Sequence, residues 1–256
     1  MTQRLLHKRA IITGSASGIG MSIAYHFSLE GARVIINYPD DKQKHLATRL
    51  VNKIKRNGGE AYAIKADVTQ IDQVRYLISH TIKLFQGIDI LVNNAGICPW
   101  SEFLNTSLDT WQITQDVNHL GTFLCSQIAA REMIKQNSGG SIISIGSVGA
   151  YTGNVMQAHY NSSKAAISSL TRSMAVALGK YKIRCNAILP GCIKTRINKK
   201  VLSRFSYKSS IVSRTPLKRL GSPLDIVGAA IYFGSDESRF CTGAELIIDG
   251  GISINT

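Results

Sequence analysis

A tyrosine and a lysine with acid–base potential stand four residues apart, at Tyr160 and Lys164. In a helix this spacing places both side chains on one face. A nearby ammonium group favours the phenolate, so we expect Lys164 to lower the pKa of Tyr160 from its usual value of about 10. Such a tyrosine can act as the general acid or base for an alcohol and its carbonyl partner. Ser147 lies just past a strand-like segment, and parallel sheets bind ligands where their strands end.

A glycine-rich turn near the start of the chain is typical of a nucleotide site. Residues 13–20 read TGSASGIG and lie between a β-branched run and a helix-like segment. Glycines allow a tight turn and let a pyrophosphate approach the N–H groups at a helix N-terminus. The spacing GxxxGxG differs from the usual GxGxxG. Its place between a predicted strand and a predicted helix still favours a dinucleotide site over a plain turn.

The end of the second predicted strand should meet the adenosine ribose of such a cofactor. A carboxylate there would select NAD, whereas its absence would leave room for the 2′-phosphate of NADP. The discriminating position falls at Tyr38, preceded by Asn37, and Asp40 and Asp41 come slightly later. This pattern favours NADP, or the use of both cofactors.

These residues must be positioned by strand-like and helix-like segments that alternate along the chain. The strand-like runs are almost continuously apolar, which is typical of strands buried on both faces. The alternation predicts an α/β fold: one doubly wound Rossmann-type domain over residues 1–256, with seven parallel strands and helices on both faces. The strands are expected at 9–13, 33–37, 61–65, 88–92, 140–145, 183–188 and 245–248, and the helices at 19–29, 42–56, 71–85, 108–136, 159–181 and 224–234.

One long connection, residues 192–221, has no clear strand pattern. Long connections inside a compact domain are usually functional, so we expect this segment to be a lid over the substrate.

Composition excludes several classes of protein. The 256 residues are 44% hydrophobic and 18% charged, as in globular proteins and unlike disordered chains. No apolar run approaches the roughly 18 residues of a membrane-spanning helix, and the first apolar run is too short for an export signal. The five cysteines are odd in number and form no CxxC pair, so we expect reduced thiols in a cytoplasmic protein.

The formal net charge of +14 is the unusual bulk property. It raises the possibility of a nucleic-acid partner. The basic residues are spread thinly, and the densest group, Lys194 to Lys208, is interrupted by apolar and hydroxyl residues. An acidic ligand such as a phosphorylated cofactor is therefore the favoured explanation.

Taken together, the motifs resemble the short-chain dehydrogenase/reductase family. The matching pieces occur in the family's order and span almost the whole chain: TGSASGIG (13–20), Asp67-Val68, NNAG (93–96), Asn118, Ser147, YNSSK (160–164), Pro190-Gly191 with Thr195, and Asp249-Gly250-Gly251.

The resemblance implies a role for each matching residue. Tyr160 would be the acid/base, and Ser147 would hydrogen-bond the reacting oxygen. Lys164 would hold the nicotinamide ribose, and Asn118 would shape its helix and hold a water that links Lys164 to solvent. The reaction would be a hydride transfer between nicotinamide C4 and a carbinol carbon, without a metal. Further cofactor contacts would come from Gly14, Ser15, Ser17, Gly18, Ile19, Gly20, Asn37, Tyr38, Asp67, Val68, Asn94, Ala95, Gly96, Pro190, Gly191, Ile193 and Thr195.

Two finer resemblances concern the substrate. RVIINYPDDK (33–42) and GGEAYAIKADVT (58–69) are similar to bacterial glucose 1-dehydrogenases of the family. Residues 93–104, 156–170 and 177–191 are similar to its L-rhamnose 1-dehydrogenases, which carry threonine where Cys192 stands here. Both imply oxidation of an aldose at C1 to a lactone.

The substrate candidates are polar side chains near the expected pocket, because a sugar needs several hydrogen-bonding partners. They are Ser147, Asn154, Gln157 and Asn198. Trp100 would stack on a sugar face or lie in a core or interface. We expect His159 to turn away from Tyr160 along the helix and to take no part in catalysis.

Two alternatives stay open. The same motifs fit NADPH-dependent reduction of a 3-oxoacyl thioester, with residues 194–208 docking an acidic acyl-carrier protein. A binder of nucleic acid or phospholipid surfaces would not need the complete Asn118, Ser147, Tyr160 and Lys164 set. We therefore expect a small-molecule substrate, no nucleic-acid or membrane partner, and the family's usual homotetramer through the helices at 108–136 and 159–181.

Overall fold

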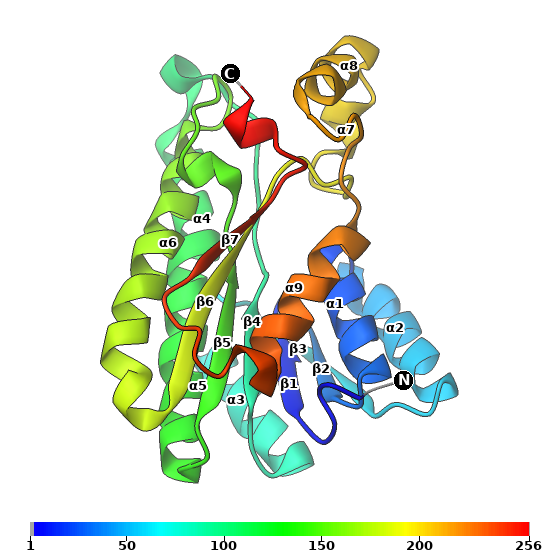
Figure 1. The fold of residues 1–256 in the computed structure, drawn as a ribbon, viewed down its shortest axis with the longest axis vertical. Coiled ribbons are helices and arrows are strands. Elements are labelled where there is room, and N and C mark those ends of the chain that lie inside the picture. The colour runs from blue at the N-terminus through cyan, green and yellow to red at the C-terminus, as the bar shows by residue number, and fades with distance from the viewer. Residues whose placement is uncertain (1–2, 256) are drawn as a thin grey trace.

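A computed structural model describes residues 3–255 and confirms the Rossmann-type sheet (Figure 1). Seven parallel strands lie in the order β3-β2-β1-β4-β5-β6-β7. Their bounds are β1 Arg9–Ile12, β2 Arg33–Tyr38, β3 Ala61–Lys65, β4 Ile90–Asn93, β5 Gly140–Ile145, β6 Ile183–Pro190 and β7 Glu245–Ile248.

Helices cover both faces of the sheet (Figure 1). One face packs against α1 (Gly18–Leu29), α2 (Lys44–Arg56) and α9 (Pro223–Gly234). The other packs against α3 (Ile71–Phe85), α5 (Gly121–Gln136) and α6 (Ala158–Leu178), and α4 (Leu108–Gln115) lies beside α6. Two short helices, α7 (Lys199–Leu202) and α8 (Phe205–Arg214), stand above the sheet in Figure 1.

The apolar runs form strands because both faces of the sheet are covered. In β1, Ala10 and Ile12 belong to the core under α1, α2 and α9, whereas Ile11 points into the core under α3 and α5. Alternate side chains of a strand point to opposite faces, so a strand buried on both sides must be apolar throughout.

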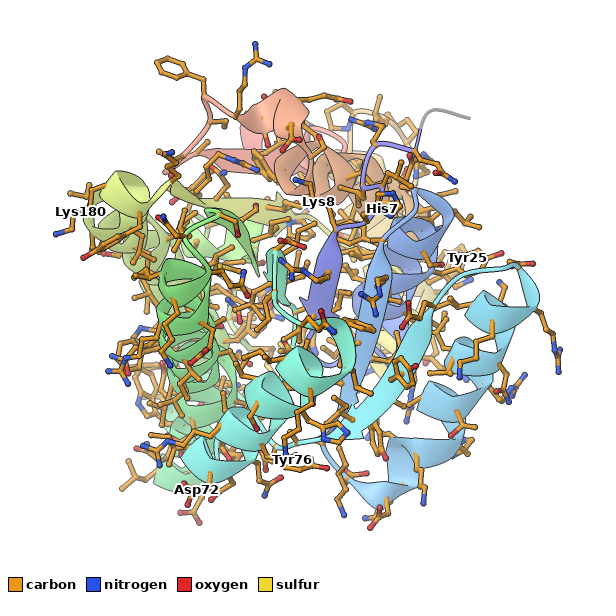
Figure 2. All side chains as sticks on the ribbon, turned by 90° about the horizontal axis from the view of Figure 1, so that it is seen from below. His7, Lys8, Tyr25, Asp72, Tyr76 and Lys180 are labelled. Carbon is orange, nitrogen blue, oxygen red and sulfur yellow. The ribbon has the colours of Figure 1, made fainter. Side chains whose placement is uncertain are left out.

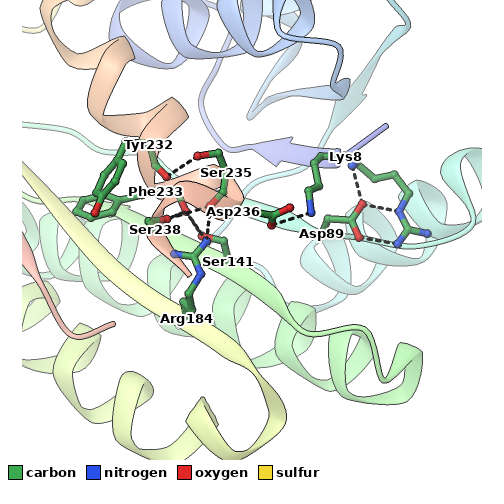
Figure 3. A network of polar contacts seen from close by, with 10 residues as sticks. Lys8, Asp89, Ser141, Arg184, Tyr232, Phe233, Ser235, Asp236 and Ser238 are labelled. Carbon is green, nitrogen blue, oxygen red and sulfur yellow. Dashed lines mark hydrogen bonds and ion pairs between the residues drawn. The ribbon is translucent and has the colours of Figure 1, made fainter. Parts of the chain in front are cut away.

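The amino edge of the sheet is closed by a polar network (Figure 3). The guanidinium of Arg184 donates to the carbonyl oxygens of Phe233 (2.7 Å) and Ser235 (3.2 Å), and the Ser141 hydroxyl donates to Phe233 (2.8 Å). These bonds satisfy carbonyls that the end of α9 leaves without helical partners. Figure 2 views this side, with His7 and Lys8 leading into β1.

Two predicted segments differ from the structure in detail. The helix predicted over 108–136 is interrupted by a π-helical turn at Asp116–Leu120, between α4 and α5. The connection at 192–221 contains α7 and α8, whose short apolar patterns gave no clear signal. Between residues 3 and 255, no helix combines the length and apolar character needed to cross a bilayer.

Candidate active site

A cleft of about 650 Å³ opens at the carboxyl edge of the sheet. The strand order reverses between β1 and β4, and this is where doubly wound sheets bind ligands. The cleft brings together most residues that the sequence predicted: Gly14, Ser17, Gly18, Ile19, Asn37, Asp67, Val68, Asn94, Ala95, Gly96, Ser147, Tyr160, Lys164, Pro190, Gly191, Ile193, Thr195 and Asn198.

The glycine turn is built to keep the floor of the cleft clear of side chains. Gly14 has φ +58°, and a Cβ there would lie 2.8 Å from Ala95 Cα. Gly18 has φ +62° and begins α1, so its open side leaves backbone N–H groups at a helix N-terminus accessible. Asn94 locks the turn by donating from Nδ2 to the carbonyls of Thr13 (2.9 Å) and Gly14 (3.1 Å). This cradle fits the phosphates of a dinucleotide.

Two predicted residues of the turn have structural contacts instead of lining the cleft. The Ser15 hydroxyl is buried, donates to the Ile12 carbonyl (2.7 Å) and accepts from the Asn37 N–H (3.1 Å). Gly20 is also buried, and a Cβ there would lie 2.4 Å from Asn94 Nδ2. Both support the turn from behind.

The adenosine end of the cleft differs from the sequence prediction. Tyr38 is 6% exposed, packs in the hydrophobic core and does not line the cleft. The residues that follow it, Pro39, Asp40 and Gln43, line the cleft in its place. The chain turns away from the sheet after Tyr38, so counting along the strand could not locate them. Among residues 3–255, no lysine or arginine lines this end.

Tyr160 and Lys164 project from the first turns of α6 toward the end of β5. Ser147, which follows β5, hydrogen-bonds to the Tyr160 phenol. Lys164 is 4% exposed, and its Nζ donates to the Ile145 carbonyl (2.8 Å) and lies 5.6 Å from the centre of the Tyr160 ring. The two side chains share one helix face, as their spacing predicted.

The acid–base properties of this pair differ from the sequence prediction. Burial raises the pKa of Tyr160 well above its usual value, and the Ser147 hydrogen bond lowers it only in part. Burial also lowers the pKa of Lys164 from 10.5 to about 8. The expected lowering of the tyrosine pKa by Lys164 is absent, because the partial burial of Tyr160 disfavours its phenolate and the nearly complete burial of Lys164 disfavours its ammonium form.

Asn118 lies in the π-helical turn and is fully buried. Its Oδ1 accepts from the Ile97 N–H (2.8 Å), and its Nδ2 donates to the Ile97 carbonyl (3.0 Å) and to the Ser163 hydroxyl (2.9 Å). A Cβ on Gly96 would lie 3.3 Å from Asn118 Oδ1 and 3.6 Å from Lys164 Nζ. Asn118 thus fixes the loop after β4 beside the lysine. A π-turn often marks a functional site, but its extra residue is not visible in sequence periodicity.

The substrate side is formed by the loop after β4 and the start of α6, which are joined at three points. Gln157 Nε2 lies 3.0 Å from Cys98 Sγ, His159 Nε2 lies 2.6 Å from the Pro99 carbonyl, and the Ser101 N–H donates to the Met156 carbonyl (3.1 Å). His159 is fully buried and does not line the cleft, so its position agrees with a supporting role.

Helix α8 reaches this loop through Tyr207, which the sequence reasoning missed. The Tyr207 ring packs edge-on against Trp100 (5.6 Å between ring centres), and its hydroxyl hydrogen-bonds to Asn154. The side chain of Asn154 therefore contacts residues 192–221 without lining the cleft itself. A single tyrosine in a segment with no clear pattern gave no signal for this contact.

Asn198 lines the cleft, but its amide closes a turn. Its Oδ1 accepts from the Thr195 N–H (3.0 Å), and its Nδ2 donates to the Ile193 carbonyl (2.8 Å). Neighbouring Arg196, also missed, lines the cleft beside Thr195.

Known proteins share this architecture. The solved structure of a short-chain type dehydrogenase/reductase from Mycobacterium marinum superposes with a TM-score of 0.93 at 37% identity, covering 98% of this chain and 97% of that one. A family profile described as Enoyl-(Acyl carrier protein) reductase matches residues 14–253. The chain belongs to the short-chain dehydrogenase/reductase family. It is therefore an NAD(P)-dependent oxidoreductase that acts on CH–OH groups.

Within this family, two relatives represent different substrates. A protein of Azotobacter vinelandii, named L-rhamnose 1-dehydrogenase (NAD(P)(+)), is 42% identical over 252 residues, which cover 98% of each chain. A Staphylococcus aureus protein, named 3-oxoacyl-[acyl-carrier-protein] reductase, is 35% identical over 245 residues, which cover 96% of this chain and 98% of that protein. The chain is more similar to the sugar dehydrogenase.

Proposed function

We propose that this short-chain dehydrogenase/reductase oxidises an aldose of the L-rhamnose or glucose type at C1 to its lactone. The observation that carries the proposal is the 42% identity to an L-rhamnose 1-dehydrogenase over 98% of both chains. The juxtaposition of Ser147, Tyr160 and Lys164 in one cleft supports it, because these groups suit an alcohol/carbonyl reaction.

In this reaction the phenolate of Tyr160 removes the proton of the anomeric hydroxyl. The O–H electron pair then forms the carbonyl bond as hydride leaves C1. Ser147 donates a hydrogen bond to the same oxygen. Bound NAD(P)⁺ supplies the acceptor for the hydride. Lys164, with its pKa of about 8, can exchange a proton near neutral pH and return the tyrosine to its reactive state.

The cofactor preference follows from the adenosine end of the cleft. We expect both NADP and NAD to bind, since the structure buries Tyr38 and places no carboxylate at the strand end itself. Asp40, two residues beyond the strand, is exposed at the adenosine end of the cleft and opposes a 2′-phosphate by charge. We still expect the protein to prefer NADP over NAD, and we expect the charge of Asp40 to make this preference smaller.

Substrate contacts would come from the polar side chains around the lid. Gln157 beside Cys98, and Asn154 beside Tyr207, face the loop that Trp100 belongs to. Neither side chain lines the cleft in this structure, and we propose that Gln157 and Asn154 reach sugar hydroxyls from beside it, whereas Asn198 shapes the turn above them.

The assembly is proposed to be a homotetramer of single-domain subunits. Apolar side chains are exposed on the helices expected at the interface, among them Leu108, Phe123 and Val176. The five cysteines are free thiols, which supports the cytoplasmic location that we propose.

A matrix of absorbance assays tests the proposal. NAD or NADP is paired with L-rhamnose, D-glucose and other aldoses, and NADH or NADPH with a 3-oxoacyl thioester. We expect reduction of the cofactor by at least one sugar. Oxidation of NADPH by the thioester, with no turnover of any sugar, would replace the proposal with the acyl-reductase alternative.

A further inference from the structure

The lid, residues 192–221, has an extreme charge composition. It contains nine basic and no acidic side chains and so carries nine of the fourteen net positive charges of the chain. All nine are exposed, and among residues 3–255 only Arg219 has a carboxylate partner, Asp225. The nine are Lys194, Arg196, Lys199, Lys200, Arg204, Lys208, Arg214, Lys218 and Arg219.

The walls of the cleft, by contrast, are balanced in charge. Lys164 and Arg196 line it together with Asp40 and Asp67. A dinucleotide carries two negative charges on its pyrophosphate, and NADP carries about two more on its 2′-phosphate. Apart from the short-range backbone N–H groups at the start of α1, the long-range attraction of such an anion must therefore come from charges outside the walls.

The lid is close enough to supply this attraction. Its residue Thr195 lies over the glycine turn, with its Cγ2 3.7 Å from the place that a Cβ on Gly18 would occupy. Arg196 follows directly and lines the cleft. The remaining cations stand on α7, α8 and their flanks, above the same edge of the sheet (Figure 1).

We propose that the basic lid attracts the phosphates of the dinucleotide from a distance and steers it into the cleft, drawing NADP in faster than NAD. The inference rests on the proposed function in one respect only, namely that the ligand is the dinucleotide cofactor. Charges that attract a ligand without bonding to it raise the association rate and leave the dissociation rate almost unchanged. Clefts ringed by one sign of charge raise association rates by about 10- to 1000-fold.

The test measures NADPH binding to the full-length protein by stopped-flow fluorescence, without any sugar. The lid variant is Lys199→Gln/Lys200→Gln/Arg204→Gln. The control, Lys180→Gln/Lys182→Gln/Arg239→Gln, removes the same charge from exposed side chains at the opposite edge of the sheet, where Figure 2 labels Lys180.

At an ionic strength of about 0.01 M, where charges act over roughly 30 Å, we expect the lid variant to lose about tenfold in association rate. Its dissociation rate, and both rates of the control variant, should change less than about twofold. The loss in association rate of the lid variant should vanish near 1 M salt. NADH should show a smaller effect than NADPH.

Equal losses in both variants, or a loss confined to the dissociation rate, would overturn the proposal. The binding assay uses no substrate, so its outcome is separate from the sugar assay. Steering can fail while sugar oxidation stands, and sugar oxidation can fail while steering stands.

Discussion

At the scale of residues, burial dominates the acid–base pair. It raises the pKa of Tyr160 and lowers that of Lys164, so both groups are driven toward their neutral forms. A general base whose pKa is raised is reactive only in a small fraction of molecules at neutral pH. We therefore expect the rate of sugar oxidation to rise with pH, measured as kcat/KM between pH 7 and 9 with saturating cofactor. A rate that falls over this range would contradict the assignment of a phenolate base.

Tyr160→Phe tests the proton transfer itself. The variant keeps the ring and loses only the hydroxyl, so we expect turnover to fall by about 10²- to 10⁴-fold while cofactor affinity is nearly unchanged. Steady-state rates and NADPH fluorescence titration measure the two effects separately. Survival of turnover would remove Tyr160 from the mechanism.

Lys164→Met tests the burial of the lysine through protein stability. The depressed pKa means that the unfolded chain binds more protons than the folded protein between about pH 8 and 10.5, so the free energy of unfolding rises with pH in that window. Below pH 8 the buried charge destabilises the fold by on the order of 3 kcal/mol. The methionine variant should therefore be more stable at pH 7 and inactive.

Urea unfolding at pH 7, 8, 9 and 10, followed by tryptophan fluorescence without cofactor, measures this difference. The stability advantage of the variant should shrink as the pH rises. A variant that is less stable than the wild type at pH 7 would show that the bond to the Ile145 carbonyl outweighs the buried charge.

At the scale of elements, helix α8 is held over the substrate side by one side chain. Tyr207 joins Trp100 and Asn154, which belong to two different loops. Tyr207→Phe keeps the ring contact and removes a hydrogen bond worth about 1 kcal/mol. We expect the KM for the sugar to rise by about fivefold, with kcat and the KM for the cofactor unchanged.

Tyr76→Phe on α3 is the matched control, because that tyrosine is exposed and remote from the cleft. An equal change in the KM of both variants, or a Tyr207 effect on the cofactor alone, would show that α8 does not close over the substrate.

The end of β2 provides a second test at this scale. Asp40→Asn removes a negative charge from the adenosine end, so the ratio of kcat/KM for NADP to that for NAD should rise by about two- to fivefold at low salt. Asp109→Asn, on the exposed side of α4, should leave the ratio unchanged. If the ratio of the Asp40 variant is unchanged, the 2′-phosphate of NADP does not bind near Asp40.

At the scale of the whole molecule, exposed apolar side chains on α5 and α6 predict association of subunits. Phe123 is 39% exposed and Val176 is 87% exposed. Sedimentation velocity should give about four times the subunit mass of 27.9 kDa for the wild type, and a smaller species for Phe123→Glu/Val176→Glu. Leu29→Glu, on α1, is the control and should stay assembled. A monomeric wild type would contradict the homotetramer.

The residue pattern alone was enough to predict the fold class and most of the cleft. Strands buried on both faces must be apolar throughout, so β1 to β6 were visible in the residue pattern. A phosphate cradle also needs glycines wherever a Cβ would collide with another segment, as a Cβ on Gly14 would with Ala95. The glycines of residues 13–20 therefore predicted the position of the cradle. The tyrosine–lysine spacing determined a shared helix face.

How deeply these groups are buried, and which distant segments meet, follows only from the packing of the folded chain. The pKa shifts of Tyr160 and Lys164 depend on atoms from several elements around them, and spacing along one helix carries no information about that enclosure. The contact between Tyr207 and Trp100 joins residues more than one hundred positions apart, through a lid without a periodic pattern. The position of Asp40 depended on a chain bend after β2. Local sequence patterns follow from local geometry, whereas dielectric surroundings and long-range contacts arise only when the elements pack.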